Sequence, residues 1–206
     1  MADVQAAFTK AGCRNVSTYI ASGNVIFDAA PSDAAALRRR IGRGMRALLG
    51  AEPVIVYRTG NELQKLVDAA PFGALADDRA IKLYVAFLVE KPQGRTAFPR
   101  NLPKEALEAI GMNNCDALIV SRRKPNGMYG FPANWIEKDL GVVATARNWS
   151  TVTKLAELAA DSAPQKKGPA YAGLEPAGSS RPSPPAAARG AASPSGGRAG
   201  SRSRAS

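Results

Sequence analysis

The chain has 206 residues, of which 45% are hydrophobic, and its formal net charge is +11. This length suits one large domain or two small ones. No apolar run reaches the roughly 20 residues of a membrane span, and the N-terminus lacks the regions of a secretory signal. The absence of histidine excludes Ser-His and Cys-His catalytic pairs, and two distant cysteines argue against a zinc site or a disulfide framework. We therefore expect a cytoplasmic protein that has no membrane, metal or cofactor requirement.

The first half of the sequence predicts a helix, two strands, a helix, a strand and a helix. Gly23 and Asn24 tolerate positive φ and fit the turn between the two strands. Ser32 can cap the long helix, and Thr59 with Glu62 forms a capping box for the next one. In chain order these elements cover residues 2–11, 16–20, 25–27, 32–49, 53–57 and 60–70.

The second half predicts a similar series that begins with a long apolar strand. Pro103 fits the first turn of a helix, and Gly111 fits its end. Gly141 likewise ends a second helix, and Asn148 caps the last one. The elements are a strand at 81–89, a helix at 103–110, strands at 117–121 and 128–131, a helix at 132–140, a strand at 142–145 and a helix from 149.

These two series predict an α+β fold of two ferredoxin-like (split βαβ) subdomains, covering residues 1–75 and 76–161. The second reads βαββαβ followed by a helix. The first reads αββαβ followed by a helix, so it lacks its opening central strand. The strands beside that gap are then expected to keep unpaired backbone groups and an open apolar face.

Residues 162–206 consist almost wholly of Pro, Ala, Gly, Ser and Arg, with seven basic residues and one acidic residue. Such a composition cannot bury enough apolar surface to fold, so a disordered tail is expected. It is either a solvated or frameshifted tail or a basic segment that binds nucleic acid. About half of the basic excess of the chain lies in it.

Two stretches are the least generic in the chain: Ser17–Phe27 (STYIASGNVIF) and Ala144–Leu158 (ATARNWSTVTKLAEL). Together they resemble the domain of unknown function 1697 family, which is mostly bacterial, over roughly residues 1–160. The resemblance implies two small α+β, ferredoxin-like subdomains and no established activity. Family members open with a strand and a Gly-rich loop that are missing before Met1, carry a Ser-Lys pair where this chain has Met128–Phe131, and lack the tail.

The residues Arg147, Asn148, Ser150 and Thr151 form the first candidate site. They surround the start of the last predicted helix, where free N–H groups and partial positive charge favour a phosphate or carboxylate. Arg147 adds a bidentate donor. The alternative is structural, with Trp149 anchoring the helix on the second sheet and Asn148 capping it.

Two further sets are candidates. Ser22, Gly23 and Asn24 either connect two strands or line a pocket with the family's Gly-rich loop. Arg39, Arg43 and Arg46 lie on one side of the helix at 32–49, where they form either a solvated face or contacts with a nucleic-acid backbone. Cys13 and Cys115 are expected to be small core residues.

The favoured hypothesis is a non-catalytic module that binds an anionic ligand, either nucleic acid or a phosphorylated small molecule. The first alternative is an enzyme of unknown reaction whose site lies between the subdomains and uses Asn24 and Arg147. The second is a truncated, frameshifted remnant without function. No nucleophile and base can be paired in the sequence, which favours the binding module. The oligomeric state stays open.

Overall fold

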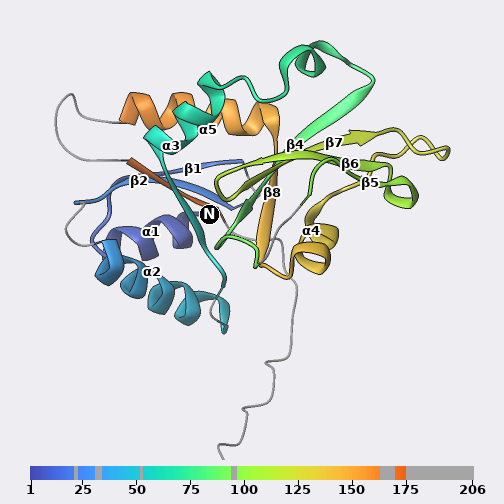
Figure 1. Cartoon of the computed structure of the whole chain (residues 1–206). Helices are drawn as coiled ribbons and strands as arrows, with labels where there is room; N and C mark the ends of the chain where they lie inside the picture. Colours follow the sequence, from blue (N-terminus) through green and yellow to red (C-terminus); the bar gives the residue numbers. More distant parts are fainter. Residues whose placement is uncertain (21–22, 31–33, 52, 94–96, 163–169, 175–206) are drawn as a thin grey trace, which may run out of the picture.

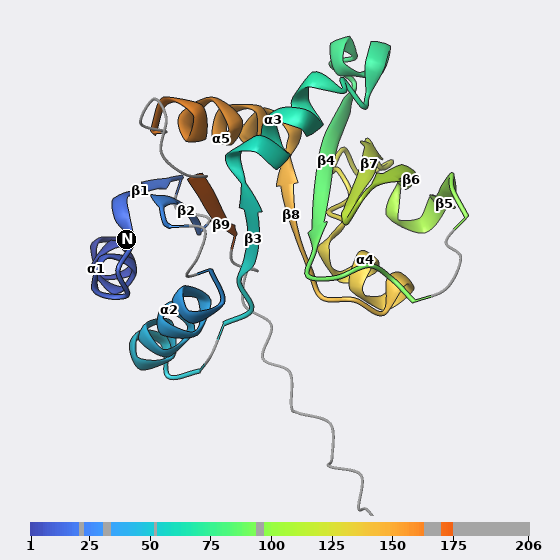
Figure 2. The same cartoon turned by 60° about the vertical axis from the view of Figure 1, so that its left-hand side comes forward.

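Two antiparallel sheets form the middle layer of the computed structural model, and helices cover both of their faces (Figure 1). The structure describes residues 1–20, 23–30, 34–51, 53–93, 97–162 and 170–174. The sheets lie side by side, with α1, α2 and α4 on one side of them and α3 and α5 on the other (Figure 2). The chain is thus an α+β protein with three layers.

The first sheet contains four strands in the order β1-β2-β9-β3, and the strands are β1 (Arg14–Tyr19), β2 (Asn24–Asp28), β9 (Ala170–Leu174) and β3 (Val56–Thr59). Helices α1 (Ala2–Lys10) and α2 (Ala34–Leu49) cover one face. Alternate residues of β2 point to opposite faces, so Val25 and Phe27 join the core under these helices, while Ile26 joins the core on the other side. Strand β2 is therefore buried on both faces.

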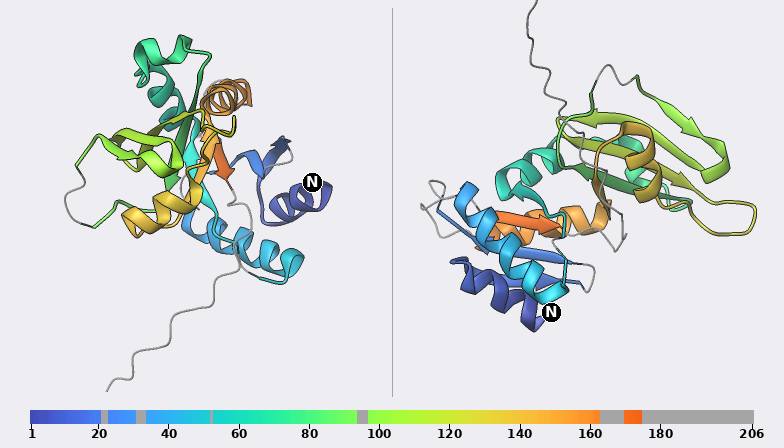
Figure 3. Two further views of the ribbon diagram at one scale, coloured as in Figure 1. Left: turned by 90° about the vertical axis from the view of Figure 1, so that its right-hand side faces the viewer. Right: turned by 90° about the horizontal axis from the view of Figure 1, so that it is seen from below.

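The second sheet contains five strands in the order β5-β6-β7-β4-β8. They are β5 (Arg100–Leu102), β6 (Leu107–Asn113), β7 (Asp116–Arg122), β4 (Ile81–Leu88) and β8 (Ala144–Asn148). Helix α4 (Ala133–Leu140) covers one face over a core that includes Ala86, Ile119 and Ile136. Seen from below, α4 lies against this sheet and α2 against the first (Figure 3).

Helices α3 (Gly60–Asp68) and α5 (Trp149–Ser162) pack on each other and span both sheets. Their side chains share one core with residues from both sheets, namely Ile26, Val56, Leu63, Leu66, Phe72, Val85, Phe87, Leu118, Val152, Leu155 and Ala156. Trp149 packs edge-on against Phe72, with ring centroids 5.1 Å apart. This common core connects the two sheets.

Strand β9 corrects two expectations from the sequence. Residues 170–174 form a strand instead of part of a disordered tail, and this strand fills the gap expected at the centre of the first sheet. It pairs antiparallel with β2 on one side and with β3 on the other. An interior position offers backbone partners on both sides, which stabilises a segment whose composition alone predicts no structure. The rest of residues 163–206 lies outside the described residues.

The predicted helix at 103–110 is wrong. Only Pro103–Glu105 is helical, as a short 3-10 turn (η3), and β6 follows at Leu107–Asn113. Pairing with β7 over this length, and with β5 on its other side, outweighs the local helix signals of Pro103 and Gly111. The predicted strand at 128–131 is also absent as a strand, because Tyr129 makes a single bridge to Arg123.

The remaining predicted helices are confirmed within a few residues. In α3, Thr59 Oγ1 accepts from Glu62 N at 3.1 Å and Glu62 Oε2 accepts from Thr59 N at 2.6 Å, so both bonds of the predicted capping box exist. Helix α4 ends at Gly141, whose φ of 66° suits a residue without a side chain. Helix α5 begins directly after Asn148, as predicted. Ser32, the predicted cap of α2, lies outside the described residues.

Candidate functional site

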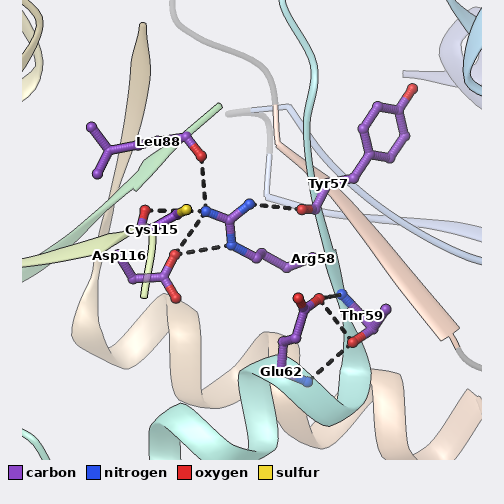
Figure 4. A network of polar contacts seen from close by, with 7 residues as sticks. All are labelled: Tyr57, Arg58, Thr59, Glu62, Leu88, Cys115 and Asp116. Carbon is purple, nitrogen blue, oxygen red and sulfur yellow. Dashed lines mark hydrogen bonds and ion pairs between the residues drawn. The ribbon is translucent and has the colours of Figure 1, made fainter. Parts of the chain in front are cut away.

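Arg58 on β3 joins the two sheets through a buried network (Figure 4). Its Nε donates to Asp116 Oδ1 at 2.9 Å, and its Nη2 donates to the carbonyl oxygens of Leu88 at 2.9 Å and Cys115 at 3.2 Å. The carbonyl of Tyr57 accepts from Nη1 at 2.8 Å. One guanidinium therefore binds its own strand and two segments of the second sheet.

The burial of Asp116 makes its contact with Arg58 important for stability. Burial raises the pKa of the Asp116 carboxyl above its usual value, and the guanidinium of Arg58 works against this by stabilising the carboxylate. The side chains of Arg58 and Asp116 are each 10% exposed, so removing either one would leave a buried polar group without its partner. Sequence analysis missed this pair, and the one local signal was an arginine directly after the predicted strand at 53–57.

Arg147 on β8 makes the second link between the sheets. Its Nε donates to Oδ1 of the fully buried Asn24 at 2.7 Å, and Nη1 donates to Thr145 Oγ1 at 2.6 Å and to the Ala146 carbonyl at 2.9 Å. Asn24 Nδ2 donates in turn to the Tyr19 carbonyl at 2.9 Å. We call the Arg58–Asp116 and Arg147–Asn24 contacts together the sheet junction. The structure thus brings together Arg147 and Asn24, which lie 123 positions apart in sequence.

The other residues of the predicted anion site separate from Arg147. Asn148 and Ser150 line a hollow of about 330 Å³ at the start of α5, together with Lys82 and Asp78. Thr151 is buried instead, and Arg147 is not part of the lining. The Asp78 carboxylate, which accepts from Ala80 N at 2.8 Å, opposes a bound anion here. The predicted four residues therefore do not converge on one point.

The predicted pocket at the first hairpin is only partly described. Ser22 lies outside the described residues, Gly23 has a φ of 78° in the turn, and Asn24 belongs to the sheet junction. The arginines of α2 have varied surroundings. Arg39, Arg43 and Arg46 are exposed, as a nucleic-acid surface requires, while Arg40 donates to the Ala11 carbonyl at 2.7 Å. Whether any of them contacts a ligand stays a prediction.

A larger hollow of about 620 Å³ lies between β5, η3 and α4, and we call it the α4 pocket. Its lining combines four kinds of side chain: the cations Lys104 and Lys138, the aromatic rings of Phe131 and Trp135, the polar Asn101 and Glu105, and the apolar Leu102 and Pro103. Volumes of about 300–1,000 Å³ are typical of small-molecule sites. Sequence analysis missed this pocket, because it predicted a helix through the residues that form its wall.

The wall that carries Phe131 is held tightly. A side chain at Gly130 would clash with the Glu105 carbonyl, so the backbone passes η3 where only glycine fits. The Gly130 carbonyl accepts from Ser121 Oγ at 2.8 Å. Phe131 is 58% exposed, and its ring meets the Tyr84 ring edge-on with centroids 5.7 Å apart. The pocket therefore presents an exposed aromatic ring in a fixed place.

The cysteines are free in the structure. Burial raises the pKa of the Cys13 thiol to about 11, and the Arg40 guanidinium nearby lowers it by a smaller amount. Among the described residues, no three His, Cys, Asp or Glu side chains are grouped to hold a metal ion. None of the helices in the described ranges is long and apolar enough to cross a bilayer.

Fold and junction together define a three-layered α+β protein in which two antiparallel sheets are joined by buried arginines. The chain belongs to the family described as Protein of unknown function (DUF1697), whose sequence profile matches residues 1–116. This confirms the resemblance, although the stretch Ala144–Leu158 lies beyond the matched residues. No curated protein and no solved structure matches the chain.

Proposed function

We propose that this protein is a non-catalytic module that binds a small anionic ligand with a planar ring, such as a nucleoside monophosphate, in the α4 pocket. The observation that carries the proposal is the meeting of two lysines and two aromatic rings in one hollow of about 620 Å³. This keeps the anionic ligand expected from the sequence but moves it away from the start of α5.

The charge of the α4 pocket favours an anion. Lys104 and Lys138 are exposed, and within the described part of the chain neither has a carboxylate partner within ion-pair distance. Glu105, the acidic residue of the lining, pairs with Lys124 at 3.0 Å, which offsets its charge. Two uncompensated ammonium groups beside one neutralised carboxylate leave a positive pocket, and phosphate is a strong partner for lysine.

The aromatic side chains favour a planar ring. Stacking of a nucleobase on an aromatic side chain contributes about 1–3 kcal/mol and tolerates any base, because every base has a π-face. Phe131 is held in place by Tyr84 and by the close passage of Gly130, so little side-chain entropy is lost on binding. The half-buried Trp135 on α4 supplies a second ring in the same pocket.

Binding without catalysis is the simpler form of the proposal. The chain has no histidine, and the pocket side chains named above include no nucleophile beside a base. A nucleic-acid function would instead use Arg39 and Arg43 on α2, which are exposed in the structure. The two functions differ in salt dependence, since contacts with several phosphates make log affinity fall steeply with log salt.

We also propose that each sheet descends from a ferredoxin-like unit. The order β1-β2-β9-β3 of the first sheet is matched by β6-β7-β4-β8 of the second, with a hairpin, a central strand and an outer strand in each. The second unit departs from the ferredoxin-like pattern, because β5 and η3 replace the first helix.

A fluorescence titration tests the function. Of the two tryptophans, Trp149 packs against Phe72, so a ligand that stacks in the α4 pocket should quench Trp135. We expect saturable quenching by nucleoside monophosphates and weaker quenching by the nucleosides. The double variant Lys104→Ala/Lys138→Ala should raise Kd about three- to tenfold at low salt, because exposed charges each contribute about 0.2–1 kcal/mol.

Two variants serve as controls. Lys65→Ala removes an exposed lysine on α3 and should leave the affinity unchanged. Trp135→Leu should abolish the quenching signal and weaken binding measured by calorimetry, provided that its circular dichroism matches that of the unmodified protein. Absence of binding at millimolar nucleotide, or equal affinity for all these variants, would rule the proposal out.

A further inference from the structure

Strand β9 occupies the centre of the first sheet although it comes from the far end of the described chain. All five residues pair with β2, from Asn24↔Leu174 to Asp28↔Ala170. Four of them also pair with β3, from Val56↔Leu174 to Thr59↔Tyr171. The backbone ladders of both neighbours therefore depend on this one short segment.

The surroundings of β9 are more apolar than its own sequence. Next to it, β2 is buried on both faces by residues such as Val25, Ile26 and Phe27, and Val56 on β3 is buried too. Helices α1 and α2 close one face of the sheet, and α3 and α5 close the other. A strand that is covered on both faces is typically a short continuous run of apolar residues.

The sequence of β9 is short of large side chains. It reads Ala-Tyr-Ala-Gly-Leu, with three small residues out of five. The corresponding strand of the second sheet, β4, also lies second from an edge, and it reads Ile-Lys-Leu-Tyr-Val-Ala-Phe-Leu over eight residues. Burying larger apolar side chains stabilises a strand by about 25 cal/mol per Å². The central position in the first sheet thus favours a more apolar strand than the one that fills it.

We propose that the strand position between β2 and β3 is a binding site for an extended apolar peptide. In this proposal β9 occupies the position in the absence of the peptide and is displaced when the peptide binds. A partner strand would run antiparallel to both neighbours, as β9 does, and would replace the same backbone ladders. Main-chain pairing supplies affinity, and the two helix layers supply selectivity for apolar residues at successive positions. β9, held at high effective concentration by its connection to α5, competes with the incoming strand.

The first experiment measures binding of a fluorescent peptide to the full chain by anisotropy. The peptide carries the β4 sequence Tyr84–Leu88 between lysine pairs that keep it soluble, and a matched peptide has proline in place of its central alanine. We expect the first peptide to bind and the second to fail, because proline cannot donate to the ladder. Equal binding of both peptides would overturn the proposal.

The second experiment weakens the pairing of β9 with its neighbours. Ala172→Pro removes a backbone donor from the middle of β9, so the variant should bind the apolar peptide at least about tenfold more tightly than the unmodified chain. A peptide with the β9 sequence should bind more weakly than the apolar one. An unchanged affinity in Ala172→Pro would contradict the idea that β9 occupies the binding site.

Hydrogen exchange on the unmodified chain gives a test that does not depend on the folding of a variant. Excess apolar peptide should speed exchange in residues 170–174, while residues 24–28 and 56–59 stay protected because the peptide pairs with them. No change in the exchange of residues 170–174 at peptide concentrations that saturate the anisotropy signal would overturn the proposal.

Discussion

Strands β4 and β9 each lie between two partner strands, second from one edge of their sheet, but they differ in length and in their place along the chain. β4 has eight residues and pairs with β7 and β8, which belong to the same half of the chain. β9 enters the first sheet from beyond α5, has five residues and pairs with β2 and β3. Equivalent positions in two sheets can therefore be occupied by sequences that differ strongly in their own tendency to form a strand. The sequence with the lower tendency, β9, depends more on pairing with its neighbours.

The largest expected effect comes from disrupting β4, the longer of these two strands. Ala86 is fully buried in β4 and faces Ala117 and Ala146 on the two sides. Ala86→Pro removes a ladder hydrogen bond and strains the middle of the sheet, so we expect a loss of about 4 kcal/mol or more in the free energy of unfolding. Ala172→Pro in β9 should cost about 1–3 kcal/mol, the scale of unmade hydrogen bonds. Chemical denaturation followed by circular dichroism measures both.

Hydrogen exchange sharpens the same comparison. In Ala172→Pro, protection should be lost in β2 and β3 and kept in β4 and β7. Equal losses from the two proline variants would show that the strands are equivalent after all.

The next effect concerns the Arg58–Asp116 contact of the sheet junction. Arg58→Ala leaves the Asp116 carboxylate and the carbonyls of Leu88 and Cys115 without their buried donor. We expect destabilisation of about 3–5 kcal/mol by urea unfolding. Asp116→Asn keeps an acceptor for Arg58 and should cost less. A double variant that costs no less than the sum of the single ones would mean that the pair is not coupled.

The Arg147–Asn24 contact should matter less. Arg147 retains neighbours on its own strand when Asn24 is lost, since Thr145 and the Ala146 carbonyl also accept from it. We expect Asn24→Ala to cost about 1–3 kcal/mol, with a coupling of about 0.5–3 kcal/mol to Arg147→Ala in a double-mutant cycle.

Arg147→Ala should leave binding in the α4 pocket unchanged. If this variant abolishes nucleotide binding while keeping its stability, Arg147 has a ligand role and the site is misplaced.

The smallest effect is a dependence on alkaline pH. The folded Cys13 thiol has a pKa of about 11 against 9.0 for an ordinary thiol, so the folded state holds its proton more tightly. This contribution to stability is complete below pH 9 and is lost as the pH rises toward 11. We expect the unfolding free energy of the unmodified protein to fall over that range relative to Cys13→Ala. Alkylation at pH 8 should accordingly modify Cys115 faster than Cys13, and the reverse order would contradict the raised pKa.

Sequence reasoning succeeded where local signals and tertiary structure agree. The capping box of Thr59 and Glu62, the apolar stripe of α2 and the glycine after α4 all act within a few residues, so the helices were predicted within a few positions. β6 was predicted as a helix because its pairing partners β5 and β7 are not visible in its own sequence. β9 was assigned to a disordered tail for the same reason, since its order comes from strands more than 100 positions away.

The candidate sites show a similar division. Arg147 and Asn24 were named as members of one site between the two halves, and they do meet, but in a buried hydrogen bond. Asn148 and Ser150 line a different hollow. Arg58 was missed, since the value of a buried arginine depends on the carbonyls that surround it. The α4 pocket could not be predicted, because its wall depends on the tight passage of Gly130 past η3.

The position of α5 and β9 also has a consequence for synthesis on the ribosome. A nascent chain emerges in order, so β1, β2 and β3 are made long before the strand that lies between two of them. The backbone pairing of Asn24 is complete only after Leu174, about 150 positions later, has been synthesised. Until then, the first half exposes an apolar interval that is prone to wrong pairing. In the second half, β4 precedes its partners β7 and β8, so this sheet can form as the chain emerges.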